Sequence, residues 1–167
     1  MLHQTDYNLQ FTDMVKRHEK IIFSVCFFYT TADTPFDDLR QEVLISLFKG
    51  FRNFLGQCSE STWVYKVCIN TCLFAQRRIT RTVKTVSIDD IPAGINVPVE
   101  SDDDFVNKLQ WLHTAIGELN PIEKAIILMW LDELSYDEIA LNMGIPRNTV
   151  ASRLSRIKMK LSAKKEI

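Results

Sequence analysis

The residues best suited to chemistry are basic and polar side chains near the C-terminus, and the chemistry they suit is binding a polyanion. Between positions 147 and 165 every charged residue is basic, and the set is Arg147, Arg153, Arg156, Lys158, Lys160, Lys164 and Lys165. A run of one sign along a single helix is typical of contact with the phosphates of a nucleic acid. The alternative is that this run forms only the solvated face of a helix.

A second set of candidate binding residues lies in the middle of the chain. It mixes aromatic, amide and basic side chains at Trp63, Lys66, Asn70, Gln76, Arg77 and Arg78. Proteins use such mixtures to stack and hold single-stranded bases. An ordinary helix whose basic end reaches into solvent would show the same pattern, so both interpretations stand at this point.

The sequence contains no set of residues that indicates catalysis. It has no glycine-rich phosphate loop, no G-x-S-x-G motif and no paired carboxylates in an apolar setting. The four cysteines include no C-x-x-C pair and the three histidines are scattered, so we expect buried free thiols and no metal site or cofactor. The protein is therefore not expected to be an enzyme.

The basic run is positioned by a predicted helix-turn-helix. Ser135 and Glu138 have the spacing of a capping box, which predicts the start of a first helix. Gly144 suits a sharp turn, and Pro146 suits the first turn of a second helix. A plain helical hairpin would share these signals. The second helix has one apolar stripe, formed by Val150, Leu154, Ile157 and Leu161.

Composition and charge indicate an ordinary globular protein of one medium or two small domains. The chain has 167 residues, 46% hydrophobic and 25% charged, with a net charge of −1, so nucleic-acid binding must come from local charge asymmetry. The N-terminus does not resemble a signal peptide, and the most apolar stretch, residues 21–29, is too short to span a membrane. We expect a cytoplasmic protein without direct membrane insertion.

The remaining pattern predicts an all-α fold of two small helical domains joined by an acidic linker. The domains span residues 1–82 and 103–167, and the linker spans 83–102. Thr34 is expected to cap a helix with Pro35 in its first turn. Beside the helix-turn-helix, apolar periodicity predicts five helices, at residues 7–30, 36–48, 62–80, 102–119 and 121–131.

Both halves of the chain resemble one family, the bacterial RNA polymerase sigma factors in their compact extracytoplasmic-function form. Three stretches carry the resemblance: DDLRQEVLISLFKGF (37–51), FLGQCSESTWVYKVCINTCLFAQRR (54–78) and LNPIEKAIILMWLDELSYDEIALNMGIPRNTVASRLSRIKMKL (119–161). Three departures concern the second half. Asn120-Pro121 stands where the family has Leu-Pro followed by an Arg, which here is Lys124. Glu133-Leu134 replaces the family's usual glycine before Ser135, and Ala151 stands where a Lys or Arg is common.

The resemblance implies a transcription initiation factor that binds core RNA polymerase, directs it to specific promoters and helps melt the minus-ten region. Residues implied in core polymerase binding are Asp37, Asp38, Leu39, Gln41 and Glu42. Those implied in binding minus-ten DNA are Trp63, Lys66, Asn70, Arg77 and Arg78. Those implied in binding the minus-35 element are Asn148, Thr149, Ser152, Arg153 and Arg156.

The resemblance also implies partners. These are core RNA polymerase, promoter DNA and an anti-sigma factor, which in this family is often membrane-anchored. Two other functions fit the residues less fully. One is a stand-alone helix-turn-helix transcriptional regulator, and the other is a sigma-like adaptor without initiation activity.

Overall fold

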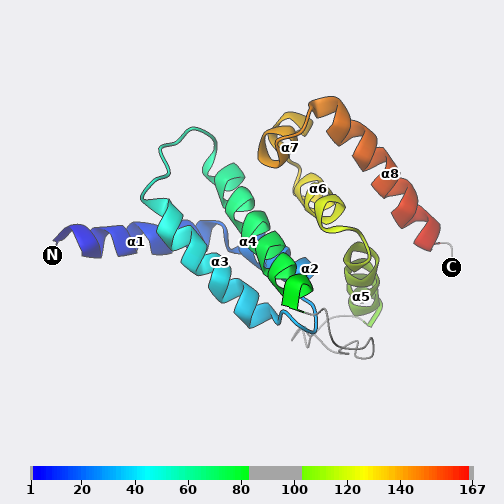
Figure 1. Ribbon diagram of the computed structural model, residues 1–167, viewed down its shortest axis with the longest axis horizontal. Helices are drawn as coiled ribbons and strands as arrows, with labels where there is room; N and C mark the ends of the chain where they lie inside the picture. The colour runs from blue at the N-terminus through cyan, green and yellow to red at the C-terminus, as the bar shows by residue number, and fades with distance from the viewer. Residues whose placement is uncertain (1, 83–102, 166–167) are drawn as a thin grey trace. The chain divides into compact units, whose positions relative to one another are not determined.

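The computed structural model describes residues 2–82 and 103–165, and in these ranges the elements are all α-helices joined by loops and turns, as the predicted all-α fold requires (Figure 1). The predicted linker, 83–102, lies outside the described residues. The chain divides into two compact units, here called the N-terminal unit and the C-terminal unit. The N-terminal unit contains α1 (Leu2–Arg17), α2 (Glu19–Tyr29), α3 (Phe36–Phe51) and α4 (Glu60–Thr82). The C-terminal unit contains α5 (Asp103–Gly117), α6 (Pro121–Leu131), α7 (Tyr136–Met143) and α8 (Arg147–Lys165).

The core of the N-terminal unit is formed where α2, α3 and α4 pack against one another. Burial of each large apolar side chain contributes roughly 1.5–3 kcal/mol, which makes this contact the main source of stability. Three of the four cysteines lie in this core as free thiols, as predicted. Fully buried residues from the three helices include Val25, Cys26, Tyr29, Leu39, Val43, Leu47, Val64, Tyr65, Cys68 and Cys72.

The predicted single helix over residues 7–30 is wrong, because the chain forms two helices that meet at His18. His18 has φ −110° and ψ 18°, outside the helical range, although backbone hydrogen bonds on either side continue from Met14 to Ile22. The His18 imidazole lies 2.8 Å from a carboxylate oxygen of Glu60, the first residue of α4. A contact with a residue so distant in sequence leaves no periodic signal, which explains the missed break.

The start of α3 also differs from the prediction. Pro35, not Thr34, occupies the N-cap position and makes no side-chain capping bond, while Thr34 is buried. Asp37 and Asp38 lie in the first turn, where the helix dipole favours carboxylates. The helix continues to Phe51, three residues beyond the predicted end.

Two helices of the C-terminal unit, α6 and α7, begin at strong side-chain caps. Asn120 accepts hydrogen bonds from the backbone N–H groups of Ile122 and Glu123, so α6 has the predicted bounds. Ser135 and Glu138 form the predicted capping box at the start of α7. Gly144 adopts the left-handed conformation, with φ 64°, in the turn to α8. The core contains Ile116, Ile126, Ile139, Val150, Leu154 and Ile157.

The C-terminal end of α6 is closed by a residue in an unusual conformation. Glu133 has φ 63°, in the left-handed region that favours glycine. Its N–H bonds to the carbonyl of Trp130 and that of Leu134 bonds to Met129, the pattern of a Schellman motif. A glutamate therefore occupies a backbone position at which the sigma-factor pattern has glycine.

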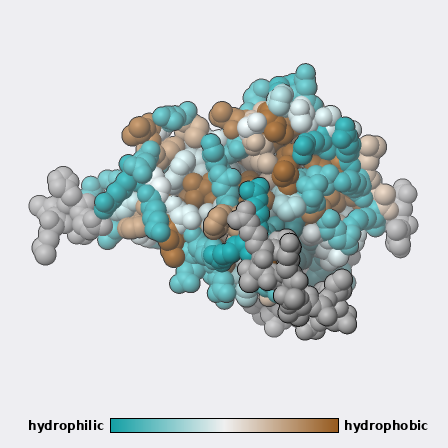
Figure 2. Space-filling model, viewed as in Figure 1, coloured by the Kyte–Doolittle hydropathy of each residue, from teal (hydrophilic) through white to brown (hydrophobic). Residues whose placement is uncertain are grey.

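The visible surface is mainly hydrophilic, with apolar side chains between the polar ones (Figure 2). The more exposed large apolar residues include Leu9, Leu55, Phe74, Leu141 and Met159. Among the helices of the described ranges, none is both long and apolar enough to cross a membrane.

Candidate nucleic-acid interface

The outer side of α4 carries most of the residues predicted to bind minus-ten DNA. Lys66, Asn70 and Arg77 are exposed. Asn70 and Arg77 follow Lys66 by four and eleven residues, so the three side chains lie on one face of the helix. Their amide and cationic groups are available to a polyanionic ligand. Trp63 begins the same face but is only half-exposed.

Trp63 is held in place by neighbouring aromatic rings. Its ring stacks on Phe54 with centroids 5.0 Å apart, and Phe51 lies 6.4 Å away. Gly50 leaves room for the indole, because a Cβ at position 50 would lie 3.1 Å from Trp63 Cζ2. The indole is therefore a fixed wall beside the loop between α3 and α4, with one face already covered by Phe54.

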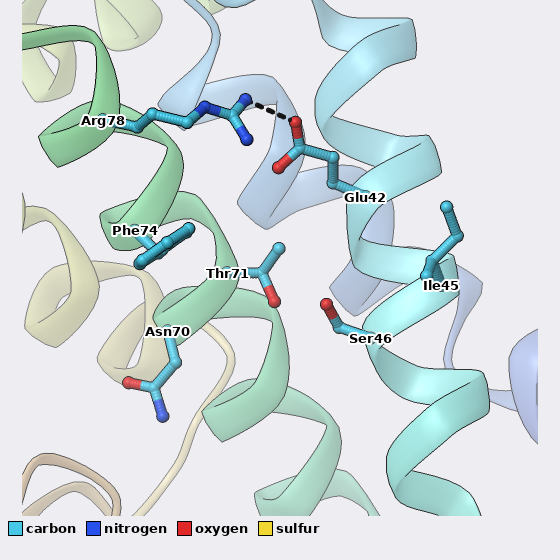
Figure 3. Close-up of a pocket in the computed structure, with 7 residues that line it drawn as sticks. All are labelled: Glu42, Ile45, Ser46, Asn70, Thr71, Phe74 and Arg78. Carbon is cyan, nitrogen blue, oxygen red and sulfur yellow. Dashed lines mark hydrogen bonds and ion pairs between the residues drawn. The ribbon is translucent and has the colours of Figure 1, made fainter.

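A groove between α3 and α4 brings two predicted binding sets together (Figure 3). In this view Ser46 and Thr71 lie between the two helices, while Asn70 and Phe74 extend from α4 on the side away from α3. The groove is lined by Glu42, Ile45, Ser46, Asn70, Thr71, Phe74 and Arg78. A polymerase-binding candidate, Glu42, thus lies beside the DNA-binding candidate Arg78, and Asn70 lines the same groove.

An ion pair joins the two walls of the groove. The Arg78 guanidinium donates to Glu42 Oε1 at 2.7 Å, as the dashed line in Figure 3 marks. Both side chains are more than 30% exposed, so the pair contributes only about 0.2–1 kcal/mol. So weak a pair can exchange for contacts with a partner, and Arg78 stays available to phosphate.

The residues predicted to bind core polymerase lie on one exposed side of α3, with one exception. Asp37, Asp38 and Gln41 are exposed, and Glu42 is half-exposed. Leu39 is fully buried, so its side chain packs in the core beneath this surface and is not available to a partner. The set available for direct contact is therefore acidic and polar.

The residues predicted to bind the minus-35 element lie on the outer side of α8. Asn148, Ser152 and Arg156 are exposed, four residues apart along one face, while Thr149 and Arg153 are half-exposed. The Ser152 hydroxyl donates to the Thr149 carbonyl at 3.1 Å. In the apolar stripe of the same helix, Val150, Leu154 and Ile157 are buried and Leu161 is half-exposed, so the polar face is the one that α8 presents to solvent.

The basic run on α8 divides into two parts. Its C-terminal half is used within the protein: Lys158 lies 3.8 Å from the centre of the Trp130 ring, Lys160 pairs with Glu123 at 2.7 Å, and Lys164 pairs with Glu118. These contacts attach α8 to the neighbouring helices. The expectation that the whole run contacts phosphate is therefore too broad.

The N-terminal half of the run remains the better candidate for DNA contact. Arg147 lies 3.4 Å from an Asp137 carboxylate oxygen and against the Tyr136 ring, both on α7. Arg153 and Arg156 extend from the next turns of α8. The cationic footprint is thus short and lies beside the exposed amide and hydroxyl groups.

Phe74 lines the groove and is exposed, but it is not among the residues predicted to bind DNA or polymerase. The apolar spacing of α4 is compatible with either Phe74 or Ala75 inside, and the structure buries Ala75 and leaves Phe74 63% exposed. An exposed phenyl ring between Asn70 and Arg78, one helical turn from each, can offer a face for stacking a base. Cys68, Cys72 and Ala75 are spaced by four and three residues, which is the spacing of one buried helix face. This spacing leaves position 74 outside that face.

The three buried cysteines differ in the pKa of their thiols, and a hydrogen bond with Cys72 lowers that of Cys26. Burial raises the pKa of the Cys68 thiol, and a hydrogen bond with Cys26 together with burial raises the pKa of Cys72. Such thiols stay protonated and unreactive at neutral pH. Among the residues that the structure describes, no three His, Cys, Asp or Glu side chains are arranged to hold a metal ion.

The sequence matches two family models of the same protein family. Residues 14–82 match sigma-70 region 2, and residues 109–161 match sigma-70 region 4. The ECF RNA polymerase sigma-E factor of Escherichia coli K12 is 28% identical over 153 residues, covering 86% of this chain and 79% of that protein. The sigma factor SigM of Mycobacterium tuberculosis is 23% identical, covering 91% and 75%.

Two solved structures share the fold. The sigma factor RpoE of Bartonella quintana, in complex with the anti-sigma factor NepR, aligns with a TM-score of 0.67 at 17% identity, covering 97% of this chain and 98% of that one. CnrH, in complex with the cytosolic domain of CnrY, aligns with a TM-score of 0.66 at 18% identity, covering 93% and 87%.

Proposed function

Because the chain belongs to the sigma-70 family, as a promoter-specific transcription initiation factor of the extracytoplasmic-function type, we propose that it binds core RNA polymerase and helps melt the minus-ten region. The observation that carries the promoter-reading part of this function is the division of α8. Most of its apolar stripe is buried, and Lys158, Lys160 and Lys164 contact other side chains of the same unit. Its outer side presents amide, hydroxyl and arginine groups to solvent. That division suits a helix that enters a DNA major groove.

The minus-35 element would be read by α8. Asn148 and Arg156 can form bidentate contacts with base edges, each worth roughly 1–3 kcal/mol of discrimination. Arg153 and the hydroxyl groups of Thr149 and Ser152 would fix the register on phosphate and base edges. Ala151 has no charged group, so the cationic contacts of α8 with DNA would come from Arg153 and Arg156.

The minus-ten element would be captured by α4 and the loop before it. Extruding a base costs a few kcal/mol, which a shaped pocket can offset. Trp63, fixed by Phe54, would form one wall of that pocket, while Lys66 and Asn70 would contact the displaced strand. Arg77 and Arg78 would hold the phosphates upstream.

Core polymerase would be bound through the exposed side of α3. Asp37, Asp38, Gln41 and Glu42 present an acidic and polar surface suited to a basic helical partner, here the clamp helices of the largest subunit. Leu39 supports this surface from below. Acidic residues that approach a basic partner mainly raise the rate of association and make it dependent on salt.

The remaining partners and the compartment follow from the family. We propose an anti-sigma factor as the regulatory partner, since both structural neighbours were solved with one or with a cytosolic partner domain. The protein would act in the cytoplasm, where DNA and polymerase are, and would carry out no catalytic step of its own.

A binding experiment with charge-reversed variants tests the polymerase part of the proposal. Labelled protein is titrated with purified core polymerase, and affinity is measured by fluorescence anisotropy at two salt concentrations. Asp38→Lys should weaken binding at least tenfold, because it places a repulsive charge at the interface. Asp13→Lys, an equally exposed change on α1, is the matched control and should have little effect.

Failure of the unaltered protein to bind core polymerase would contradict the proposal. Tight binding to duplex DNA without polymerase would then favour a stand-alone regulator. Core binding without promoter-directed initiation would instead indicate a sigma-like adaptor.

A further inference from the structure

The loop between α3 and α4, residues 52–59 and here called the capture loop, is tied at both ends to the segment formed by α1 and α2. The proposed function assigns base capture to this loop and to the start of α4, and the inference below depends on that assignment. The residues that make the ties are outside the set predicted to bind polymerase or DNA. Their contacts are specific enough to suggest a task of their own.

The entrance of the capture loop is held by Tyr7. The Tyr7 hydroxyl donates to the carbonyl of Phe48, which lies in the last turn of α3, where helix carbonyls have no partner within the helix. The Tyr7 ring packs edge-on against Phe48 and beside Phe51, with centroids 5.2 and 5.6 Å apart. The Arg52 guanidinium, in the first residue of the loop, lies over the same ring at 4.6 Å.

Phe11, one turn further along α1, repeats this packing. Its ring lies 5.0 Å from Phe48 and 5.8 Å from Phe51. Phe51 in turn lies 6.4 Å from Trp63, on the far side of the loop. The aromatic contacts therefore run continuously from α1 through the end of α3 to the start of α4.

The exit of the capture loop is held by Glu60. Its carboxylate accepts hydrogen bonds from Arg17 Nε at 3.2 Å and from Arg17 Nη2 at 2.9 Å, and lies 2.8 Å from His18 Nε2. Arg17 ends α1, and His18 is the break between α1 and α2. Burial would raise the pKa of the Glu60 carboxyl, but the bonds from Arg17 and His18 outweigh it and lower that pKa.

The contacts of Arg17 and His18 with Glu60 also compensate the negative charge of its carboxylate. A bare carboxylate at the end of a loop that receives DNA would repel the phosphates of the strand. With Arg17 and His18 against it, the same carboxylate anchors α4 while its charge is compensated. Loss of the anchor and loss of compensation would both oppose base capture.

We infer that α1 braces the capture loop at both ends, and that Tyr7 and Glu60 are positioning residues for the capture of minus-ten bases. Neither residue is assigned a contact with DNA. Both act by keeping the capture loop and Trp63 in the conformation that receives an extruded base. Preformed pockets avoid the ordering cost that a mobile loop would add to each capture event.

The test measures base discrimination by the complex with core polymerase. The probe is a pool of fork-junction DNAs, randomised across the single-stranded minus-ten segment and across the duplex minus-35 segment. Bound molecules are sequenced, and the enrichment at each position reports preference separately for the two elements. Tyr7→Leu and Glu60→Gln should reduce minus-ten preference by about three- to tenfold and leave minus-35 preference unchanged.

Two matched controls lie on the same helix. Leu9→Ala changes an exposed residue of α1, and Lys16→Met removes a charge beside Arg17, so both should keep full minus-ten preference. Tyr7→Phe keeps the ring and loses only the hydroxyl, so it should fall between the unaltered protein and Tyr7→Leu. This graded variant also keeps the test valid if Tyr7→Leu fails to fold.

The outcomes separate the inference from the proposed function. If the unaltered protein shows no base preference with core polymerase, the proposed function fails and the inference fails with it. If it shows preference and both Tyr7→Phe and Glu60→Gln retain it within twofold, only the inference is overturned. An equal loss at minus-ten and minus-35 positions would also overturn it, since general destabilisation would then be the cause.

Discussion

Replacing Glu133 with glycine should stabilise the C-terminal unit, although it removes a side chain. Glu133 closes α6 with φ 63°, a conformation in which the Cβ of an L-residue crowds the backbone. Its side chain is exposed, so little packing is lost with it. The hydrogen bonds that close α6 come from the backbone and are kept by glycine.

The size of the gain follows from two opposing effects. The left-handed conformation costs a residue with a Cβ roughly 1–2 kcal/mol. Glycine loses more backbone freedom on folding, which costs about 0.5–1 kcal/mol. The net gain therefore lies between about 0 and 1.5 kcal/mol, and its central value of about 0.75 kcal/mol should raise the melting temperature of a unit of this size by roughly 3–6 °C.

Amide hydrogen exchange of α6 measures this gain within the C-terminal unit alone. The slowest amides of buried residues such as Ile126 and Leu128 report the opening free energy of the unit. Glu133→Ala removes the charge but keeps the Cβ, so it should give no gain. Asp132→Gly, at φ −88° beside it, should destabilise by about 0.5–1 kcal/mol.

Two results would refute this reasoning. An equal gain from Glu133→Ala would assign the effect to the charge and not to the backbone. A loss of stability in Glu133→Gly would mean that the glutamate makes a favourable contact that outweighs the conformational cost.

Three further predictions concern the same unit. Leu154→Ala, in the buried stripe of α8, should cost about 2–5 kcal/mol in urea unfolding, and a cost below 1 kcal/mol would contradict the packing described. Asn120→Ala removes the cap of α6 and should cost about 0.5–2 kcal/mol in the same assay, whereas Asn120→Asp should keep most of the stability. Hydrogen bonds from the Ser135 backbone and hydroxyl lower the pKa of Glu138 below its ordinary 4.5, so its contribution is complete above pH 4.5 and lost as the pH falls through the lowered value. Glu138→Gln should therefore flatten the fall in stability over that acidic range, and an unchanged slope would count against the capping box.

The parts of the fold that could be predicted from sequence are those fixed by neighbouring residues. The bounds of α6 follow from Asn120 and Pro121, and the start of α7 follows from Ser135 and Glu138. Gly144 marks the turn of the helix-turn-helix for the same reason. Each of these signals acts within one helical turn, so it can be read without knowledge of tertiary contacts.

The parts that could not be predicted depend on residues far apart in the chain. The break at His18 goes with a bond to Glu60, 42 residues away. The ion pair of Lys160 depends on Glu123, which lies on another helix, whereas the sequence shows only a uniform basic run. The same holds for Arg78, which pairs with the polymerase-binding candidate Glu42 on α3 and lines a groove with it.

Burial also refined the candidate site in a way that motif matching could not. Leu39 belongs to the stretch that resembles the core-binding helix of sigma factors, yet its side chain is inside the protein. Phe74 lies outside the predicted set, yet its ring is exposed beside Asn70. A motif selects residues by position, whereas availability to a partner depends on which face of the helix each residue occupies.

Run-off transcription tests the central proposal most directly. Purified core polymerase is supplied with the protein and a library of promoter fragments from its own genome, and transcripts are mapped. We predict discrete start sites, with Asn70→Ala weakening initiation through the minus-ten element and Arg156→Ala weakening it through the minus-35 element. Absence of any start site, despite a stable complex with core polymerase, would contradict the proposal that this protein initiates transcription.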